Sequence, residues 1–410
     1  MGGFATESFE LCSFLLLKGS ITVKKIEMSF NRFKNKDSIL KKLNLIIAAS
    51  VSLMGVTSVQ ADTTIKFDDD RSITIGAGLR TSFNSVEDGS PSGSSRSKDF
   101  TIDNMRFYFN AQVYKNIELE FNTERDSARD EIRVLDAVGK FHFSDMLNIR
   151  VGRMVTPLDR TDLSGPYYMN GWDFPIAAAW PAIFQGRDDG AVAWGQSGGK
   201  GGHFKYYAGV FQGSHGPSNQ DSKLAYLGRV AYNFWDPEPG YYNANTYYGA
   251  QDTLAIGVAG MRQGDATGTA ADSGDFQGWS VDGLMEKKLS NSGVVTLEGS
   301  YFDYDLDNKP WSVSGDEFPA TQGNGYFAYA GYMFPTKVGM GNFRPNVRIE
   351  RFDADFASPI FAAGKMDKWT LGLDYIIKEH NARFSVLFGE TDTPVQDKTN
   401  FFRIGMQLQI

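Results

Sequence analysis

The sequence is poor in cysteine and histidine, and its main part has no long apolar run. Cys12 is the only cysteine, and there are 4 histidines among 410 residues. Beyond Cys12 the chain therefore has no disulfide, thiolate metal site, cysteine nucleophile or covalently attached haem. We expect no cofactor and no metal, and a fold held together by packing or strand pairing alone.

The chain also lacks an excess of basic residues. It has 41 Lys and Arg against 49 Asp and Glu, of which 8 and 4 lie in residues 1–61. This leaves 33 basic and 45 acidic residues, a net charge of −12, in residues 62–410. Because nucleic-acid binding needs a basic face, we expect no nucleic-acid partner.

The first 61 residues have the order of a secretory signal peptide. A lysine-rich stretch precedes an apolar stretch at 43–59, and Val59-Gln60-Ala61 has the small residues of a cleavage site. A membrane helix fits less well, because polar residues interrupt the run and no later segment has about 18 apolar residues. We predict cleavage after Ala61, with Met28 a plausible start and 1–27 an over-long gene start. One domain, 62–410, remains.

Residues 62–410 show almost no helical periodicity. Instead, segments in which apolar and polar residues alternate recur between turn residues, a pattern typical of half-buried strands. We predict sixteen strands: 72–84, 100–113, 116–125, 131–143, 147–154, 189–196, 202–213, 224–235, 250–262, 276–288, 293–305, 323–334, 342–352, 367–378, 381–390 and 399–410.

The last eight residues, RIGMQLQI at 403–410, have an apolar residue at every second position up to the terminus. They resemble the terminal insertion signal of bacterial outer-membrane barrels, although that signal usually ends in an aromatic residue. With the secretion signal, this predicts an all-β fold: a transmembrane antiparallel β-barrel of about 16 strands in the Gram-negative outer membrane, surrounded by its lipid. A soluble sandwich or propeller would also alternate, but no blade-length repeat is present.

The predicted connections alternate in length, as short periplasmic turns and long outer loops do in such barrels. Short ones include 144–146 and 379–380, and long ones include 85–99 and 263–275. The link 236–250 is long, although the alternation predicts a short periplasmic turn at this position. Because it is rich in tyrosine, we interpret it as a periplasmic excursion at an aromatic girdle.

Strand parity predicts which side chains face the lumen. Charge on the lipid face costs about 2–4 kcal/mol for Arg or Lys at mid-membrane, so charged residues should point inward. A barrel of this size is wide enough for an aqueous channel. For any one lumen charge, a salt bridge that packs the interior is the alternative to a role in selectivity. The predicted pore-lining residues are Arg106, Glu118, Glu120, Lys140, Arg229, Arg344, Arg348 and Arg383.

The longest connection, 155–188, is too rich in aromatic residues and proline to be a solvated loop. Folding inward would bury these residues and narrow the channel; packing on a neighbouring subunit is the alternative. Parity places Arg153 on the outer face unless the strand ends or bulges at Gly152. The candidate constriction residues are Arg150, Arg153, Asp159, Arg160, Arg187 and Asp188.

Three segments suggest a family: VGRMVTPL at 151–158, GRDDGA at 186–191 and YYAGVFQG at 206–213. They resemble, in turn, the entry to the long third loop, the start of the next strand and a Tyr-x-x-Gly-x-Phe-x-Gly strand of the phosphate-selective porin O/P family. The resemblance is clearest over 150–235. It implies a sixteen-stranded, homotrimeric outer-membrane channel whose third loop lines the constriction.

Phosphate-selective members of that family use a stack of arginines and a lysine cluster in the lumen. Here the arginines are scattered and opposed by carboxylates. The resemblance therefore implies passive diffusion of small polar solutes, with oxyanions such as phosphate among the candidates. Arg150, Arg160 and Arg187 have the guanidinium geometry that suits an oxyanion.

The sequence also bears on two other classes of function. Outer-membrane enzymes need a placed nucleophile and base, but there is no Gly-x-Ser-x-Gly elbow and the histidines lie in or beside turns, so we predict no enzymatic activity. A barrel can also act as a scaffold that holds a partner protein, for example an electron-transfer cytochrome. Any haem would then belong to the partner.

Overall fold

The computed structural model describes residues 63–127, 129–313, 318–358 and 362–410. The predicted signal peptide and leader, residues 1–61, lie outside the described residues. Within the described part, most of the chain forms strands, and the connections 156–186 and 234–252 enter the interior.

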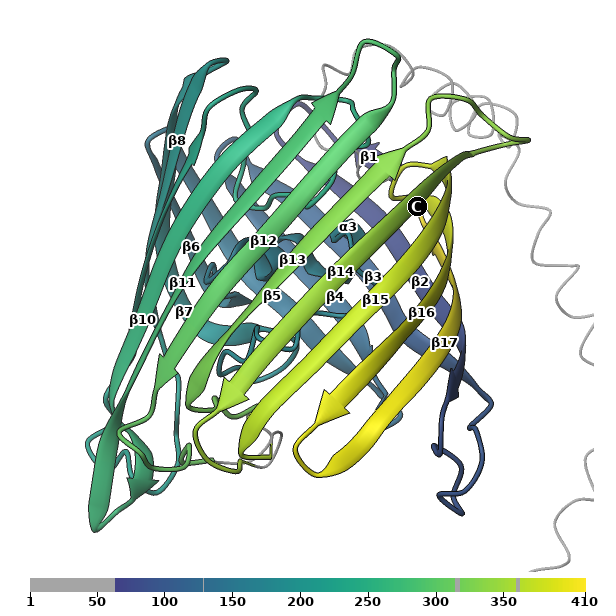
Figure 1. Ribbon diagram of the computed structural model, residues 1–410. Helices are drawn as coiled ribbons and strands as arrows, with labels where there is room; N and C mark the ends of the chain where they lie inside the picture. Colours follow the sequence, from purple (N-terminus) through teal and green to yellow (C-terminus); the bar gives the residue numbers. More distant parts are fainter. Residues whose placement is uncertain (1–62, 128, 314–317, 359–361) are drawn as a thin grey trace, which may run out of the picture. The chain divides into compact units, whose positions relative to one another are not determined.

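Sixteen long strands form one antiparallel sheet that closes on itself (Figure 1). Each strand pairs with its successor, and β17 pairs with β2 to complete the wall. The barrel prediction is confirmed, since every predicted strand overlaps one of these. The strands are β2 (Ser72–Val86), β3 (Asp99–Tyr114), β4 (Ile117–Asp126), β5 (Glu131–Ser144), β6 (Leu147–Val155), β7 (Arg187–Gly199), β8 (Gly202–Phe211), β9 (Ala225–Asn233), β10 (Thr253–Thr269), β11 (Asp272–Lys288), β12 (Val294–Asp305), β13 (Gly323–Met333), β14 (Asn342–Ala354), β15 (Gly364–Lys378), β16 (Ala382–Thr393) and β17 (Gln396–Gln409).

A short additional strand, β1 (Thr63–Lys66), pairs with the start of β2. β17 pairs with β2 from Gly78 onward, and the amide of Ile410 donates to the carbonyl of Ala77 at 2.8 Å. β1 and β17 thus pair with successive parts of the same edge of β2. The closed wall therefore still has sixteen strands.

The pleat sorts the side chains onto two faces as alternation predicts. On β3, Phe107 is 53% exposed on the outside and the neighbouring Arg106 only 6% on the inside. Apolar side chains such as Val151, Val258 and Leu371 are likewise exposed on the outer face of other strands. An apolar exterior and a closed hydrogen-bond ladder are what a bilayer requires of a spanning sheet.

The connections at one end of the barrel are short, and most of those at the other end are long. Residues 115–116 and 379–381 are examples of the first kind, and 87–98 and 306–322 of the second. The prediction of a long loop at 263–275 is wrong. β10 and β11 extend through these residues and are joined by a turn at 270–271, with a bulge after Gln263. This hairpin extends beyond the wall at the lower left of Figure 1.

The helix α3 (Arg160–Tyr168) lies inside the barrel (Figure 1). Its N-cap, Asp159, accepts hydrogen bonds from the amides of Thr161 and Asp162 at 2.5 and 3.1 Å. A left-handed Gly165, with φ of 64°, kinks the helix just before Pro166. No helix of the described residues is long and apolar enough to span a membrane. Because α3 lies inside the wall, the long connection 156–186 folds inward, as one of the two sequence alternatives predicted.

The link 234–252 also folds inward, from the end with short connections. Tyr241 is buried, and its hydroxyl donates to the carbonyl of Val155 at 3.0 Å. The interpretation of this link as an excursion at an aromatic girdle is therefore wrong. Wall groups accept from the hydroxyls of Tyr241 and Tyr242, and Glu238 of the link itself accepts from that of Tyr247.

Candidate pore constriction

Segment 156–186 is seated on glycines of the inner wall. A Cβ at Gly78 would lie 2.6 Å from the ring of Tyr167, and a Cβ at Gly405 would lie 2.5 Å from the ring of Trp172. Only a residue without a side chain allows so close an approach. The two aromatic rings therefore fix where the segment crosses the lumen, beside β2 and β17.

Charged groups of the segment are locked by ion pairs. Arg160 donates from both terminal nitrogens to the two carboxylate oxygens of Glu238, at 2.7 and 2.6 Å. Both side chains are about 3% exposed. Although burial opposes ionisation, the Arg160 guanidinium lowers the pKa of Glu238 to about 2. Near the middle of the segment, Asp173 pairs with Arg403 at 2.7 Å.

Asp159 and Asp162 form a buried carboxylate pair at the start of α3. Burial and the nearby Asp282 raise the pKa of Asp159, and burial together with Asp159 raises that of Asp162 well above its usual value. Two carboxyl groups this close favour a shared proton over two charges. Asp159 therefore acts chiefly as a helix cap rather than as an exposed pore charge.

Arg150 and Glu120 form a buried ion pair on the lumen side of the wall. Arg150 donates to Glu120 and to the hydroxyl of Tyr242, both at 2.9 Å. The guanidinium carbon lies 4.2 Å from the ring centre of Tyr241. Link 234–252 thus covers both groups, and the predicted constriction charge of Arg150 is balanced.

Most other predicted lumen residues also form ion pairs with a residue of opposite charge. Lys140 lies 2.9 Å from Glu118 and 3.4 Å from Glu120. The alternative weighed for single charges, a salt bridge that packs the interior, describes these residues. The remaining pairs are Arg106–Glu124 at 2.7 Å, Arg187–Asp136 at 3.1 Å, Arg229–Asp282 at 2.5 Å, Arg344–Asp374 at 2.8 Å and Arg348–Glu350 at 2.8 Å.

Two predicted constriction residues, Arg153 and Asp188, do not present a free charge to the lumen. Arg153 is paired in register with Asp189 on the outer face, and donates to its carboxylate at 2.8 and 2.9 Å. Parity is retained through Gly152, so no bulge turns Arg153 inward. Asp188 is buried and accepts from the amide of Gly213 at 2.8 Å, which ties β7 to the loop after β8.

Two lumen arginines differ from the rest. Among the described residues, neither Arg80 nor Arg383 has a carboxylate at ion-pair distance. Their guanidinium carbons lie 4.2 and 5.9 Å from the ring centre of Trp172. Arg80 is repelled by Arg383 and attracted by the more distant carboxylates of Asp173 and Asp103. Nε of Arg80 and Nε and Nη2 of Arg383 have no hydrogen-bond partner in the described part of the chain.

Arg383 was predicted to line the pore, and Arg80 was missed. The signal for Arg80 was present, because it falls on the inward parity of the 72–84 strand, between Gly78 and Ser82. What the sequence does not show is that Trp172 reaches both residues from another segment.

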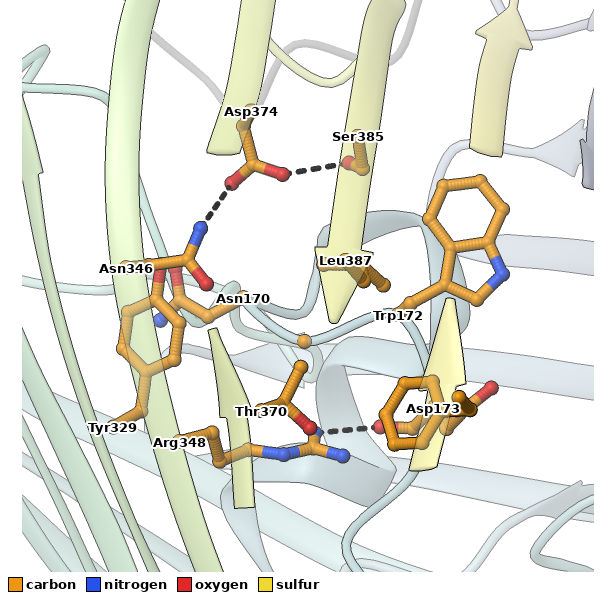
Figure 2. A pocket seen from close by; sticks show the side chains of 12 residues that line it. Asn170, Trp172, Asp173, Tyr329, Asn346, Arg348, Thr370, Asp374, Ser385 and Leu387 are labelled. Carbon is orange, nitrogen blue, oxygen red and sulfur yellow. Dashed lines mark hydrogen bonds between the residues drawn. The ribbon is translucent and has the colours of Figure 1, made fainter. Parts of the chain in front are cut away.

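A cavity of about 20 Å³ lies between the segment and the wall beside Trp172 (Figure 2). Asp374 accepts from Asn346 and Ser385 on one side of it, and Arg348 donates to the carbonyl of Asp173 on the other. The volume suits about one water-sized molecule. The segment thus meets β13–β17 through polar groups around this cavity as well as through the packing of Trp172 on Gly405.

The family model for "Phosphate-selective porin O and P" matches residues 73–410. The chain belongs to this porin family. The resemblance inferred from residues 150–235 is confirmed, and it extends over the whole barrel. No curated protein sequence matches the chain.

Solved porin structures share the fold of this porin. An anion-selective porin from Comamonas acidovorans has a TM-score of 0.53 at 11% identity, over 83% of this chain and 100% of that chain. The outer-membrane channel DcaP of Acinetobacter baumannii has 0.52 at 11%, over 84% and 99%. Salmonella typhi OmpF, in complex with Daunomycin, has 0.52 at 11%, over 85% and 100%.

Family and fold together make this porin an outer-membrane channel for small solutes. They are those of channels rather than of enzymes, and they give no support to the alternative of a cytochrome scaffold. Among the described residues, no group of three or more His, Cys, Asp or Glu is arranged to hold a metal ion.

Proposed function

We propose that this porin conducts small anions preferentially, and that they pass the guanidinium groups of Arg80 and Arg383 beside Trp172. The single observation that carries the proposal is that these two lumen arginines lack carboxylate partners, whereas the other predicted lumen arginines have one. An uncompensated positive charge at a narrow point favours anions and excludes cations.

The free N–H groups add a chemical preference. Nε and Nη2 of Arg383 are buried donors without an acceptor in the described residues. Guanidinium donors suit oxyanions with two oxygens at a fixed spacing. A chloride or phosphate-like ion would satisfy both the charge and the donors. Of the solved structures compared, one is itself an anion-selective porin.

Reversal potentials in planar bilayers under a salt gradient test this proposal. We expect the native porin to prefer chloride over potassium, and Arg80→Gln and Arg383→Gln to reduce that preference. Arg351→Gln is the matched control, since Arg351 is already paired with Asp367 at 2.6 Å away from the lumen. Native selectivity in both lumen variants would rule out this constriction.

We further propose that the porin is a homotrimer whose subunits meet near β5–β7. The outer face there has short side chains at Ala137, Gly139, Ala191 and Ala193, next to the Arg153–Asp189 pair. Such a face allows close approach of a second wall. The similar OmpT of Vibrio cholerae, with a TM-score of 0.50 at 12% identity over 83% of this chain and 100% of that chain, has been solved in a trimer form.

A further inference from the structure

The link between β9 and β10 is unusual for its end of the barrel. Connections at that end are otherwise short, as at 115–116 and 145–146, but 234–252 is long and enters the lumen. Its buried residues include Glu238, Asn245 and Thr246. A polar segment is retained inside the barrel only if it has partners there. Its partners therefore show which part of the structure the link stabilises.

The partners at one end of α3 are in the link. Besides its two bonds to Glu238, Arg160 donates from Nη1 to the carbonyl of Ala244 at 2.9 Å. The side chain of Asn243 donates to the carbonyl of Arg160 at 3.1 Å. The first residue of the helix is therefore bound through both its side chain and its backbone.

The other end of α3 is bound by the same link. The amide of Asn245 donates to the carbonyl of Tyr168 at 3.0 Å, and Asn170 donates to the carbonyl of Asn245 at 2.6 Å. Met169 and Trp172, which contact Arg383 and Arg80, follow directly in the chain. Any movement of α3 would therefore displace the groups that narrow the pore.

The wall offers the Arg160 side chain a more distant partner than Glu238. Among the described residues, Asp282 is the other carboxylate at ion-pair distance, 3.9 Å from Nε of Arg160, and it accepts from the backbone amide of Arg160 at 3.2 Å. It is already engaged by Arg229 through two bonds of 2.5 and 3.0 Å. Removal of the Glu238 charge would leave a buried guanidinium without its bidentate partner, which favours movement of the helix away from this site.

We infer that 234–252 is a second constriction element that enters from the end with short connections, and that Glu238 is the positioning residue that holds α3 across the lumen. The inference rests on the proposed channel function, because it concerns how the constriction is held. It assigns the pore width to two segments from opposite ends of the barrel rather than to the long loop alone.

Single-channel recording of the full porin tests the inference. Glu238→Gln keeps the side-chain size and removes the charge; we expect a higher unitary conductance with flicker between levels. The matched control is Asp236→Asn in the same link, whose carboxylate pairs with the exposed Lys200 at 3.1 Å. It should conduct as the native porin does. Native conductance and noise in Glu238→Gln, or a lower conductance, would overturn the inference.

A second set of variants separates positioning from stability. Arg160→Gln and the double variant Arg160→Gln/Glu238→Gln should show the same raised conductance as Glu238→Gln, since the two groups act as one unit. If only thermal stability falls while folded channels conduct normally, the role is structural and the inference fails. Should Glu238→Gln not fold, Asn243→Ala removes one bond to α3 and should show the same flicker. If the native porin itself has no conductance, the channel function fails instead.

Discussion

The indole ring of Trp172 lies directly on the backbone of Gly405. A Cβ at position 405 would be 2.5–2.7 Å from three atoms of the ring. Gly405 lies in the last strand of the wall, and Trp172 lies in a connection that begins after β6. The final strand thus provides the surface on which the constriction segment rests, so one glycine links closure of the barrel to the width of the pore.

Gly405→Ala should push Trp172 away from the wall and into the lumen. We expect a lower unitary conductance and a stability loss of about 1–3 kcal/mol, the usual cost of overpacking. Gly228→Ala is the control, because a Cβ there meets no atom within 4 Å. Equal conductance in both variants would show that Trp172 does not limit the pore.

Glu124→Gln should increase anion preference, the opposite of the effect expected for Arg80→Gln. Glu124 is fully buried and is paired with Arg106 at 2.7 Å. Removal of its charge leaves Arg106 as a third uncompensated guanidinium, at a stability cost of about 3–5 kcal/mol for a broken buried pair. Reversal potentials measure the selectivity, and thermal unfolding in detergent measures the cost. A shift toward cations would contradict the electrostatic explanation.

The Arg160–Glu238 contact should persist in moderately acidic solution. The pKa of Glu238 is depressed to about 2, below its usual value of 4.5. A depressed carboxyl pKa contributes stability that is present above the unfolded pKa and is lost as the pH falls toward 2. Unitary conductance should therefore be steady from about pH 7 to pH 4 and show flicker only near pH 2–3. Flicker that begins at pH 5 would argue against the pair.

Asp162 should have the opposite pH dependence. Burial and the neighbouring Asp159 raise the pKa of Asp162. The protonated carboxyl group therefore stabilises the folded state at low pH. This stabilisation is lost as the pH rises through the pKa of the folded protein. Asp162→Asn should unfold at a higher temperature than the native porin at alkaline pH, with a smaller difference at pH 4. Asp221→Asn, in an exposed loop, is the control. A variant less stable at every pH would exclude this effect.

The subunit contact near β5–β7 can be tested by charge reversal. Arg153→Glu places two carboxylates side by side on the outer face and should reduce the fraction of trimer. Arg351→Glu reverses a similar outward pair, Arg351–Asp367, on a distant part of the wall. It should leave the trimer intact. Native mass spectrometry of the detergent-solubilised porin gives the ratio of trimer to monomer. Equal ratios would place the contact elsewhere.

The wall was predictable because strand pairing has a period of two. Every second residue of 100–113 or 367–378 faces the same side, so the sequence alone separates Phe107 from Arg106. The link 263–275 was misassigned because its glycine-rich composition suits a loop as well as a hairpin extension. The inward folding of 156–186 was predicted from its apolar content, which water would not solvate.

The sequence by itself determined the number of strands, their two faces and the inward segment, because each depends on local periodicity and composition. Only the tertiary structure decided which charges are balanced. Arg160 meets Glu238 across 78 positions of sequence, and Arg80 lies beside Trp172 without a carboxylate. Such pairings depend on where the inward segments pack against the wall. Local sequence patterns do not specify these long-range contacts.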